Sequence, residues 1–209
     1  MISRRRLVAF SGAGAAIAPL ALAPIPGLAR RRSERPRTYI RTFANTQPLD
    51  ILSYTTRSSS ISVSGLKKTR LRAVALTLHN LSHHLLGPVS FLLVAPGGRN
   101  VIPLSDVVVN DVRNVTLTLD DYAVRDVPAG PPLVSGIYRP RNYNDDPGSD
   151  FNPADVPPVS GKVALSTFSG IDPNGEWTLY VYNANVSEPG SVAGGWSLNV
   201  TAVARKIKR

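Results

Sequence analysis

Hydrophobic and polar residues alternate over short stretches of this chain, and most stretches end at residues that form turns. Val74, Leu76 and Leu78 share one face of such a stretch, and residues 115–119 repeat the pattern. Alternation with a period of two is typical of a strand with one buried face. Residues 89–94 are instead continuously apolar, which predicts a strand that is buried on both faces.

Nine such stretches follow one another, and no sustained helical period occurs after the first part of the chain. This spacing predicts an all-β fold, an antiparallel sandwich of about eight or nine strands. Residues 126–160 are rich in Pro, Gly, Asn and Asp, and they predict a long, irregular but ordered loop. The expected strands lie within residues 61–63, 73–79, 89–94, 101–104, 107–109, 115–119, 163–168, 177–183 and 196–203.

Two of the expected strands begin with a tryptophan. Residues 172–175 read Asp-Pro-Asn-Gly, which is strong turn chemistry, and Trp177 follows in step with alternating apolar residues. Trp196 opens the other strand in the same way, so the alternation favours core positions for both indoles over a carbohydrate-stacking role. Tyr180 and Tyr182 face the other way and are the better candidates to face a ligand.

The formal charge of +10 is concentrated at the ends of the sequence. Residues 1–37 hold eight Arg and one Glu, and residues 205–209 hold four basic residues. Residues 38–204 carry 12 basic and 13 acidic residues, a net charge of −1. A nucleic-acid-binding domain usually carries its basic excess on the folded surface, so this distribution argues against nucleic acid as a partner. The chain has no cysteine, so disulfides and thiolate chemistry are excluded.

The first 29 residues are typical of an export signal. A basic start is followed by a mildly apolar run at 7–23, and Gly27-Leu28-Ala29 offers small residues for a signal peptidase. Ser3-Arg4-Arg5 resembles a bacterial twin-arginine signal, and a general secretory signal fits equally well. The run is too short and too rich in Gly and Pro for a membrane span, so we expect no transmembrane segment in the mature chain.

These observations predict four parts. Residues 1–29 are an export signal, residues 30–45 a disordered basic linker, residues 46–204 the β-sandwich, and residues 205–209 a basic tail. The expected location is outside the cell, or in the periplasm or cell envelope.

Eight segments between about residues 58 and 202 resemble, in order and spacing, the P domain, also called the Homo B domain. This domain accompanies the catalytic domain of furin-like and bacterial subtilisin-family proteases. The resemblance implies a jelly-roll sandwich related to galactose-binding-like domains, associated with serine-type endopeptidases and supporting the folding and regulation of a protease. The segments are residues 60–66, 74–83, 91–98, 104–106, 117–121, 133–136, 168–179 and 194–198. The signature residues in the last two are Phe168, Gly170, Asp172, Asn174, Gly175, Trp177 and Trp196.

Catalysis by this chain alone is not expected. A serine protease needs a nucleophile, a base and an orienting acid together, and no serine here lies in a recognisable nucleophile motif. His79, His83 and His84 lie within six residues of one another, which is poor spacing for a zinc site without cysteine. We expect His83 to be a turn residue and predict neither catalytic nor cofactor-binding residues.

Calcium is the more favourable metal. Several carboxylates lie at expected strand ends or in loops, where oxygen ligands can gather, although the simpler interpretation, which we favour, is that they are turn-forming, solvated acids. Residues 85–90 lack the carboxylates that bacterial relatives of the P domain often carry there. The candidates are Asp106, Asp121 and Asp172, with Asp120, Asp145, Asp146 and Asp150 as further loop acids.

The hypothesis that follows is a secreted, non-catalytic sandwich that stabilises, docks to or regulates a partner protein, with a subtilisin-like serine protease as the expected partner. Two alternatives stay open. The chain could be an enzymatic component of a serine endopeptidase system, or it could be an extracellular glycan-binding module.

Overall fold

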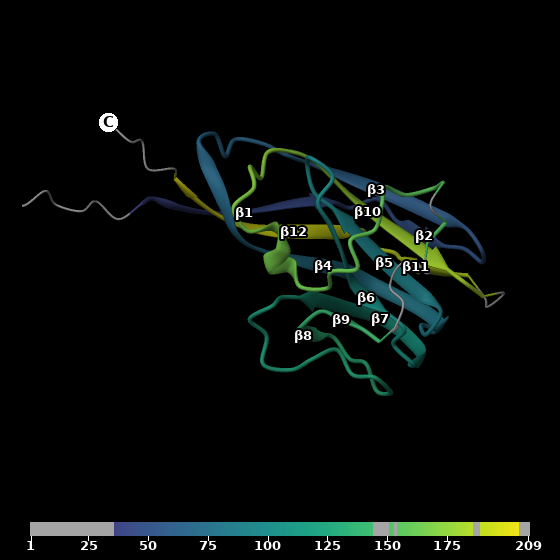
Figure 1. Ribbon diagram of the computed structural model, residues 1–209. Helices are drawn as coiled ribbons and strands as arrows, with labels where there is room; N and C mark the ends of the chain where they lie inside the picture. Colours follow the sequence, from purple (N-terminus) through teal and green to yellow (C-terminus); the bar gives the residue numbers. More distant parts are fainter. Residues whose placement is uncertain (1–35, 144–150, 153, 186–188, 205–209) are drawn as a thin grey trace, which may run out of the picture. The chain divides into compact units, whose positions relative to one another are not determined.

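The computed structural model describes residues 36–143, 151–152, 154–185 and 189–204 (Figure 1). Over these residues the chain forms twelve β-strands and one short 3₁₀ helix. The predicted export signal, the first part of the linker and the basic tail lie outside the described residues, as do Asp145, Asp146 and Asp150. No helix in the described part is long and apolar enough to cross a membrane.

One sheet has seven strands, with β1, β12, β4, β11 and β2 in that order across it and with β7 and β8 added beside β4. Every pairing in it is antiparallel except that of β7 with β8. Its strands are β1 (Thr38–Asn45), β2 (Leu49–Ile51), β4 (Thr69–Leu85), β7 (Asn110–Leu119), β8 (Gly136–Tyr138), β11 (Gly190–Val192) and β12 (Trp196–Ala204).

The second sheet has five strands in the order β3, β10, β5, β6, β9. Its pairings are antiparallel except for the parallel pair β6 and β9. Its strands are β3 (Thr56–Val63), β5 (Val89–Val94), β6 (Asn100–Ser105), β9 (Arg141–Asn142) and β10 (Gly175–Asn183).

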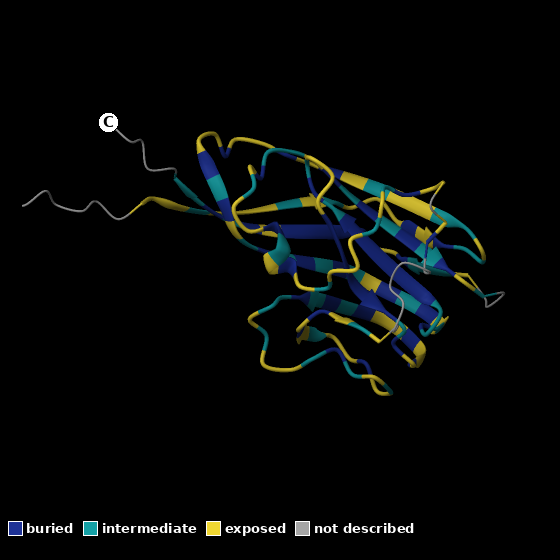
Figure 2. Ribbon diagram, viewed as in Figure 1, coloured by how far each residue is buried: buried dark blue, intermediate teal, exposed yellow. Residues whose placement is uncertain are grey.

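The core lies between the two sheets, where the alternating apolar side chains of both meet. Figure 2 shows the buried positions along the strands in dark blue. Leu76 and Leu78 of β4 are fully buried, and so are Leu179 and Val181 of β10. Each buried side chain of this size contributes about 1.5–3 kcal/mol relative to an exposed one. The predicted fold class, an all-β sandwich of mainly antiparallel strands, is confirmed.

The outer face of β5 is also covered, as its continuous apolar sequence predicted. Leu92 of this strand forms a second cluster with Ile102, Phe151 and Val156. The covering residues come from the end of the 126–160 segment, which therefore packs on the sandwich. The same segment carries the short strands β8 and β9.

The prediction of disorder through residue 45 is wrong for residues 38–45. These residues form β1, which pairs with β12 along its whole length, from Thr38 opposite Val203 to Asn45 opposite Trp196. Tyr39 and Phe43 lie four residues apart and pack against the core, and their half-buried rings anchor the strand. The segment was predicted to be disordered because basic and polar residues surround these two aromatic anchors.

Two other short segments differ from the prediction. Residues 107–109 form no strand, although Val107 and Val109 are buried. Within the predicted strand at 163–168, the 3₁₀ helix η1 (Leu165–Phe168) forms instead. Its two apolar residues are three positions apart, so a helical turn buries both on one side.

Strand β4 extends well beyond the predicted residues 73–79. Its pairing with β7 shifts between Leu78 and Leu81, where Asn80 adopts a positive φ of 57°. The shift lets Leu78 and Leu81, three positions apart, both point into the core. After it, His83 points inward, while Ser82 and His84 lie on the outer face.

Candidate functional site

The signature stretch before β10 builds the scaffold. Trp177 is fully buried, and its ring meets the Phe168 ring edge-on with 5.0 Å between centroids. The indole Nε1 donates a 3.0 Å hydrogen bond to the Pro173 carbonyl, which ties the strand to its own turn. Gly175 has a φ of +126°, and a Cβ there would lie 2.9 Å from the Cβ of Pro96. Only glycine fits this crossing point.

Asn174 joins this turn to a distant loop. Its Oδ1 accepts from the Leu66 backbone N–H at 2.9 Å, and its Nδ2 donates to the Leu66 carbonyl at 3.0 Å. The amide thus satisfies both backbone groups of a buried residue 108 positions away. Trp196 is also fully buried, and its Nε1 donates to the Ser59 hydroxyl at 3.0 Å. Both tryptophans are core residues, as the alternation predicted.

Each of the three calcium candidates accepts hydrogen bonds from neighbouring groups of the protein. Asp121 accepts from the backbone N–H groups of Leu165 and Ser166 at 2.9 and 2.6 Å and so caps η1. Asp106 accepts from the hydroxyl of the preceding residue, and Asp172 accepts from the backbone N–H of Asn174. No group of three His, Cys, Asp or Glu side chains that could hold a metal is found in the described part of the chain.

The histidines do not converge. His79 makes a 2.9 Å hydrogen bond through Nε2 to the hydroxyl of Ser197, on the neighbouring strand β12. His83 is buried, and its Nδ1 accepts from the Leu85 backbone N–H at 3.1 Å. His84 is exposed, and its Nδ1 lies 2.8 Å from an Asp111 carboxylate oxygen.

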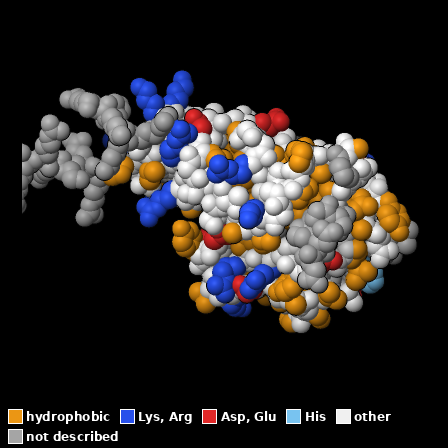
Figure 3. Space-filling view, in the orientation of Figure 1, with side chains coloured by type: hydrophobic (Ala, Val, Ile, Leu, Met, Phe, Trp, Pro, Cys, Tyr) orange, Lys and Arg blue, Asp and Glu red, His pale blue; other side chains and the backbone are white. Residues whose placement is uncertain are grey.

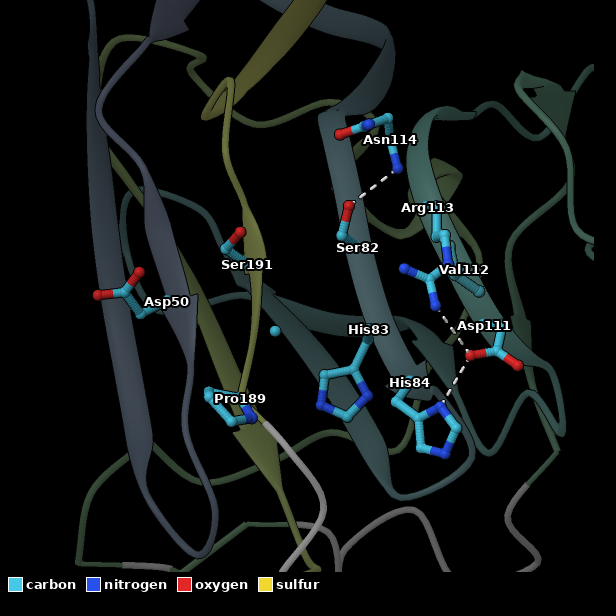
Figure 4. A pocket seen from close by; sticks show the side chains of 11 residues that line it. Asp50, Ser82, His83, His84, Asp111, Val112, Arg113, Asn114, Pro189 and Ser191 are labelled. Atoms are coloured by element: carbon cyan, nitrogen blue, oxygen red, sulfur yellow. Dashed lines mark hydrogen bonds and ion pairs between the residues drawn. The ribbon is translucent and has the colours of Figure 1, made fainter.

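His83 and His84 both border a hollow of about 450 Å³ on the seven-stranded sheet, which we call the histidine hollow (Figure 4). Burial lowers the pKa of His83, and the neighbouring His84 lowers it further. The hydrogen bond from His84 lowers the pKa of Asp111, and Arg113 acts in the same direction. The hollow is lined by Asp50, Ser82, His83, His84, Asp111, Val112, Arg113, Asn114, Pro189, Gly190 and Ser191.

A second hollow, of about 500 Å³, lies beside exposed apolar side chains after β7. Val124 is 91% exposed, Tyr122 77% and Ile137 58%. These three residues, together with Arg125, line one continuous surface, which we call the loop surface. Exposed apolar side chains that gather in one place mark interaction sites more often than scattered ones do.

The backbone that carries the loop surface is well fixed. The Asp120 side chain accepts from the Tyr122 N–H at 2.9 Å, and the Asp120 carbonyl accepts from the Ala123 N–H at 3.0 Å. The Arg125 guanidinium lies 5.3 Å from the centre of the Tyr138 ring. These contacts therefore fix the backbone that carries the loop surface.

An ion-pair group borders the loop surface. Asp126 accepts hydrogen bonds from Arg141 and Arg139, and these hydrogen bonds lower its pKa. In return, Asp126 raises the pKa of Arg141. In Figure 3, basic and acidic side chains lie beside hydrophobic ones over the region of β8 and β9.

Tyr180 and Tyr182 do not form an open aromatic platform. Both are half-buried against the second hydrophobic cluster, and the Phe151 ring lies 6.1 Å from that of Tyr182. Sequence reasoning also missed the loop surface, because Tyr122, Val124 and Ile137 follow no strand period. The one signal was the presence of apolar residues in a loop-forming stretch.

Two of the solved structures that are similar to this chain contain a serine protease of Aeromonas sobria. A serine protease and chaperone complex from Aeromonas sobria matches with a TM-score of 0.42 and 16% identity, covering 82% of this chain and 28% of that chain. The serine protease of Aeromonas sobria matches with a TM-score of 0.40 and 17% identity, covering 80% and 27%. No family model and no curated protein matched. This chain therefore spans little more than a quarter of the length of the bacterial serine protease that it is similar to.

Proposed function

We propose that this chain is an exported, non-catalytic β-sandwich of the P-domain type that docks to a partner protein and stabilises it. The proposed partner is a subtilisin-like serine protease. The role rests on the sequence resemblance to the P domain and on one structural observation, the loop surface.

The loop surface supports a protein partner because its apolar side chains are exposed on an ordered backbone. Three large apolar side chains that are more than half exposed gain free energy when a partner removes them from water. A loop already fixed by hydrogen bonds loses little conformational entropy on binding. Tyrosine with adjacent arginine is also the composition that dominates binding energy in protein interfaces.

The contacts of the signature residues favour a structural role for this chain over a catalytic one. The polar side-chain atoms of these residues form hydrogen bonds within the sandwich. Trp177 donates to the Pro173 carbonyl, Asn174 donates to the Leu66 carbonyl, and Trp196 donates to the Ser59 hydroxyl. The most distinctive residues of the chain thus stabilise the sandwich, which presents the loop surface.

The test uses the purified mature protein and the secreted subtilisin-like proteases of the same bacterium. We expect one protease to bind, and its melting temperature and its residual activity on casein after heating to rise. Tyr122→Ser and Val124→Asp should each weaken binding at least tenfold, as loss of an interface anchor does. Tyr54→Ser is the matched control, because Tyr54 is also exposed, at 61%, but lies away from the loop surface.

Three results would overturn the proposal. The first is that no protease binds, and the second is that Tyr54→Ser weakens binding as much as Tyr122→Ser does. The third is cleavage of casein by the purified chain alone, with activity lost on serine-directed labelling, which would make the chain an enzyme.

A further inference from the structure

The histidine hollow lies on the outer face of the seven-stranded sheet and shares no lining residue with the loop surface. Asp50 on β2, Ser191 on β11 and Ser82 on β4 are directly paired across neighbouring strands. Cross-strand neighbours of this kind point to the same face with Cβ atoms about 4.5–5.5 Å apart. The three polar side chains therefore form one row across the floor of the hollow. In Figure 4, Asp50, Ser191 and Ser82 follow one another across the three strands, and His83 and His84 lie below Ser82.

Much of the hydrogen-bonding capacity in the hollow is unused. Among the described residues, the side chains of Asp50 and Ser191 have no hydrogen-bond partner. The Ser82 hydroxyl accepts from the Asn114 backbone N–H at 2.8 Å, so its own proton is free to be donated. Arg113 meets Asp111 through Nη2 at 3.5 Å, which leaves its other N–H groups free.

His84 adds a group that can accept a hydrogen bond. Its Nδ1 faces the Asp111 carboxylate at 2.8 Å, so the ring proton of the neutral imidazole sits on Nδ1. The other nitrogen, Nε2, is then an acceptor, and it becomes a donor when the ring is protonated. Together with Asp50 as acceptor, the arginine as donor and the serines, the hollow offers both kinds of hydrogen-bonding group.

This mixture selects among ligand classes. An anion would meet the carboxylates of Asp50 and Asp111, and a cation would meet Arg113. An apolar ligand would bury polar groups without partners, because eight of the eleven lining residues are polar or charged. A neutral polyhydroxylated molecule can instead donate to the carboxylate and imidazole and accept from the serine and arginine groups.

The floor of the hollow is shaped by one glycine. A Cβ on Gly190 would collide with the ring of His83 and with the Ser82 carbonyl. The absence of a side chain brings β11 against β4 and keeps the Ser191–Ser82 pair close. The volume of about 450 Å³ lies within the range of small-molecule sites.

We infer that the histidine hollow binds a saccharide unit through the row Asp50, Ser191 and Ser82 and the pair His84 and Arg113. This site is independent of the proposed protein-binding role, and it does not include Tyr180 and Tyr182, which the sequence offered as candidates to face a ligand.

The experiment follows the imidazole resonances of the purified mature protein by NMR at constant pH. The chain has three histidines. His83 and His84 border the hollow, whereas His79 bonds to Ser197 and does not line it, so it serves as an internal reference. The probes are D-glucose, D-galactose and N-acetyl-D-glucosamine, each titrated separately, with inorganic phosphate as the anionic comparison. We expect at least one sugar to shift His84 and His83 in a saturable way and to leave His79 unmoved.

Variants locate the site. Ser191→Ala should raise the Kd about fivefold, the loss of one neutral hydrogen bond, and Asp50→Ala about tenfold or more, because its acceptor is charged. Ser58→Ala is the matched control, an exposed strand serine on the other sheet, and its Kd should equal that of the wild type.

Several outcomes would overturn the inference. The first is that no sugar shifts His83 or His84, and the second is that His79 shifts equally. A Kd unaffected by both Ser191→Ala and Asp50→Ala in folded protein would place the sugar elsewhere. Saturable shifts with phosphate but not with sugars would make the hollow an anion site.

Discussion

Replacement of Trp177 by alanine tests whether the signature stretch is scaffold. The indole is fully buried, and truncation of a buried Trp to Ala costs about 3–5 kcal/mol of unfolding free energy. Two local features place this variant towards the upper end. The edge-on contact with Phe168, at 5.0 Å, is worth about 0.5–1.5 kcal/mol beyond area burial. The Pro173 carbonyl also loses the donor that Nε1 provides at 3.0 Å.

Urea denaturation measures this loss. The sequence contains two tryptophans, so Trp196 still reports on unfolding by fluorescence, and circular dichroism gives a second signal. We expect the urea concentration at the midpoint of unfolding to fall. The slope of the unfolding free energy against urea concentration should not change, since the same surface is exposed on unfolding. Trp177→Phe is the matched variant. It keeps an aromatic ring but removes the hydrogen bond, and it should cost only about 1–2 kcal/mol.

Two results would refute the reasoning. A Trp177→Ala protein that loses less than about 1 kcal/mol would show that the indole is not a core anchor. A stable, well-folded variant that selectively loses partner or sugar binding would show that the signature stretch takes part in binding.

Two further predictions concern buried polar groups. Asn174→Ala should lower the free energy of unfolding by about 1–3 kcal/mol, because the N–H and carbonyl of buried Leu66 lose their partner; a loss equal to that of Asn110→Ala, a control at an exposed strand position, would contradict this. His83 should make stability depend on pH. Burial lowers its pKa in the folded state, so the unfolded state binds more protons as the pH falls below about 6.5. In urea titrations at a series of pH values, the contribution of His83 to the free energy of unfolding should therefore be at its maximum above that pH and decline below it. His83→Asn should flatten this decline, and an unchanged slope in the folded variant would exclude His83 as its cause.

The sequence predicted those parts of the fold whose signal is local. Trp177 and Trp196 alternate with apolar neighbours, and both are core residues. The apolar run at 89–94 is buried on both faces because a second cluster covers Leu92. Strand β1 escaped prediction because its two anchors, Tyr39 and Phe43, are separated by polar and basic residues, and pairing with β12 supplies the rest of its stability.

The candidate sites depend on contacts that are distant in sequence. His84 meets Asp111, 27 residues away, because β4 and β7 are paired. The row from Asp50 to Ser82 exists only because β11 lies between β2 and β4. These contacts cannot be predicted from residue type or from spacing along the chain. The sequence could therefore identify the histidines only as isolated candidates, without their partners.

The pairing of β1 with β12 joins the first and last strands of the described domain. Thr38 lies opposite Val203, so the two ends of the domain leave it as adjacent chains. A short linker could therefore connect them, and new termini could be opened in an exposed turn such as that at Gly97 and Gly98. Such a circular permutant would keep every strand pairing. The same geometry means that a protein fused to either end would be tethered at one common corner of the sandwich.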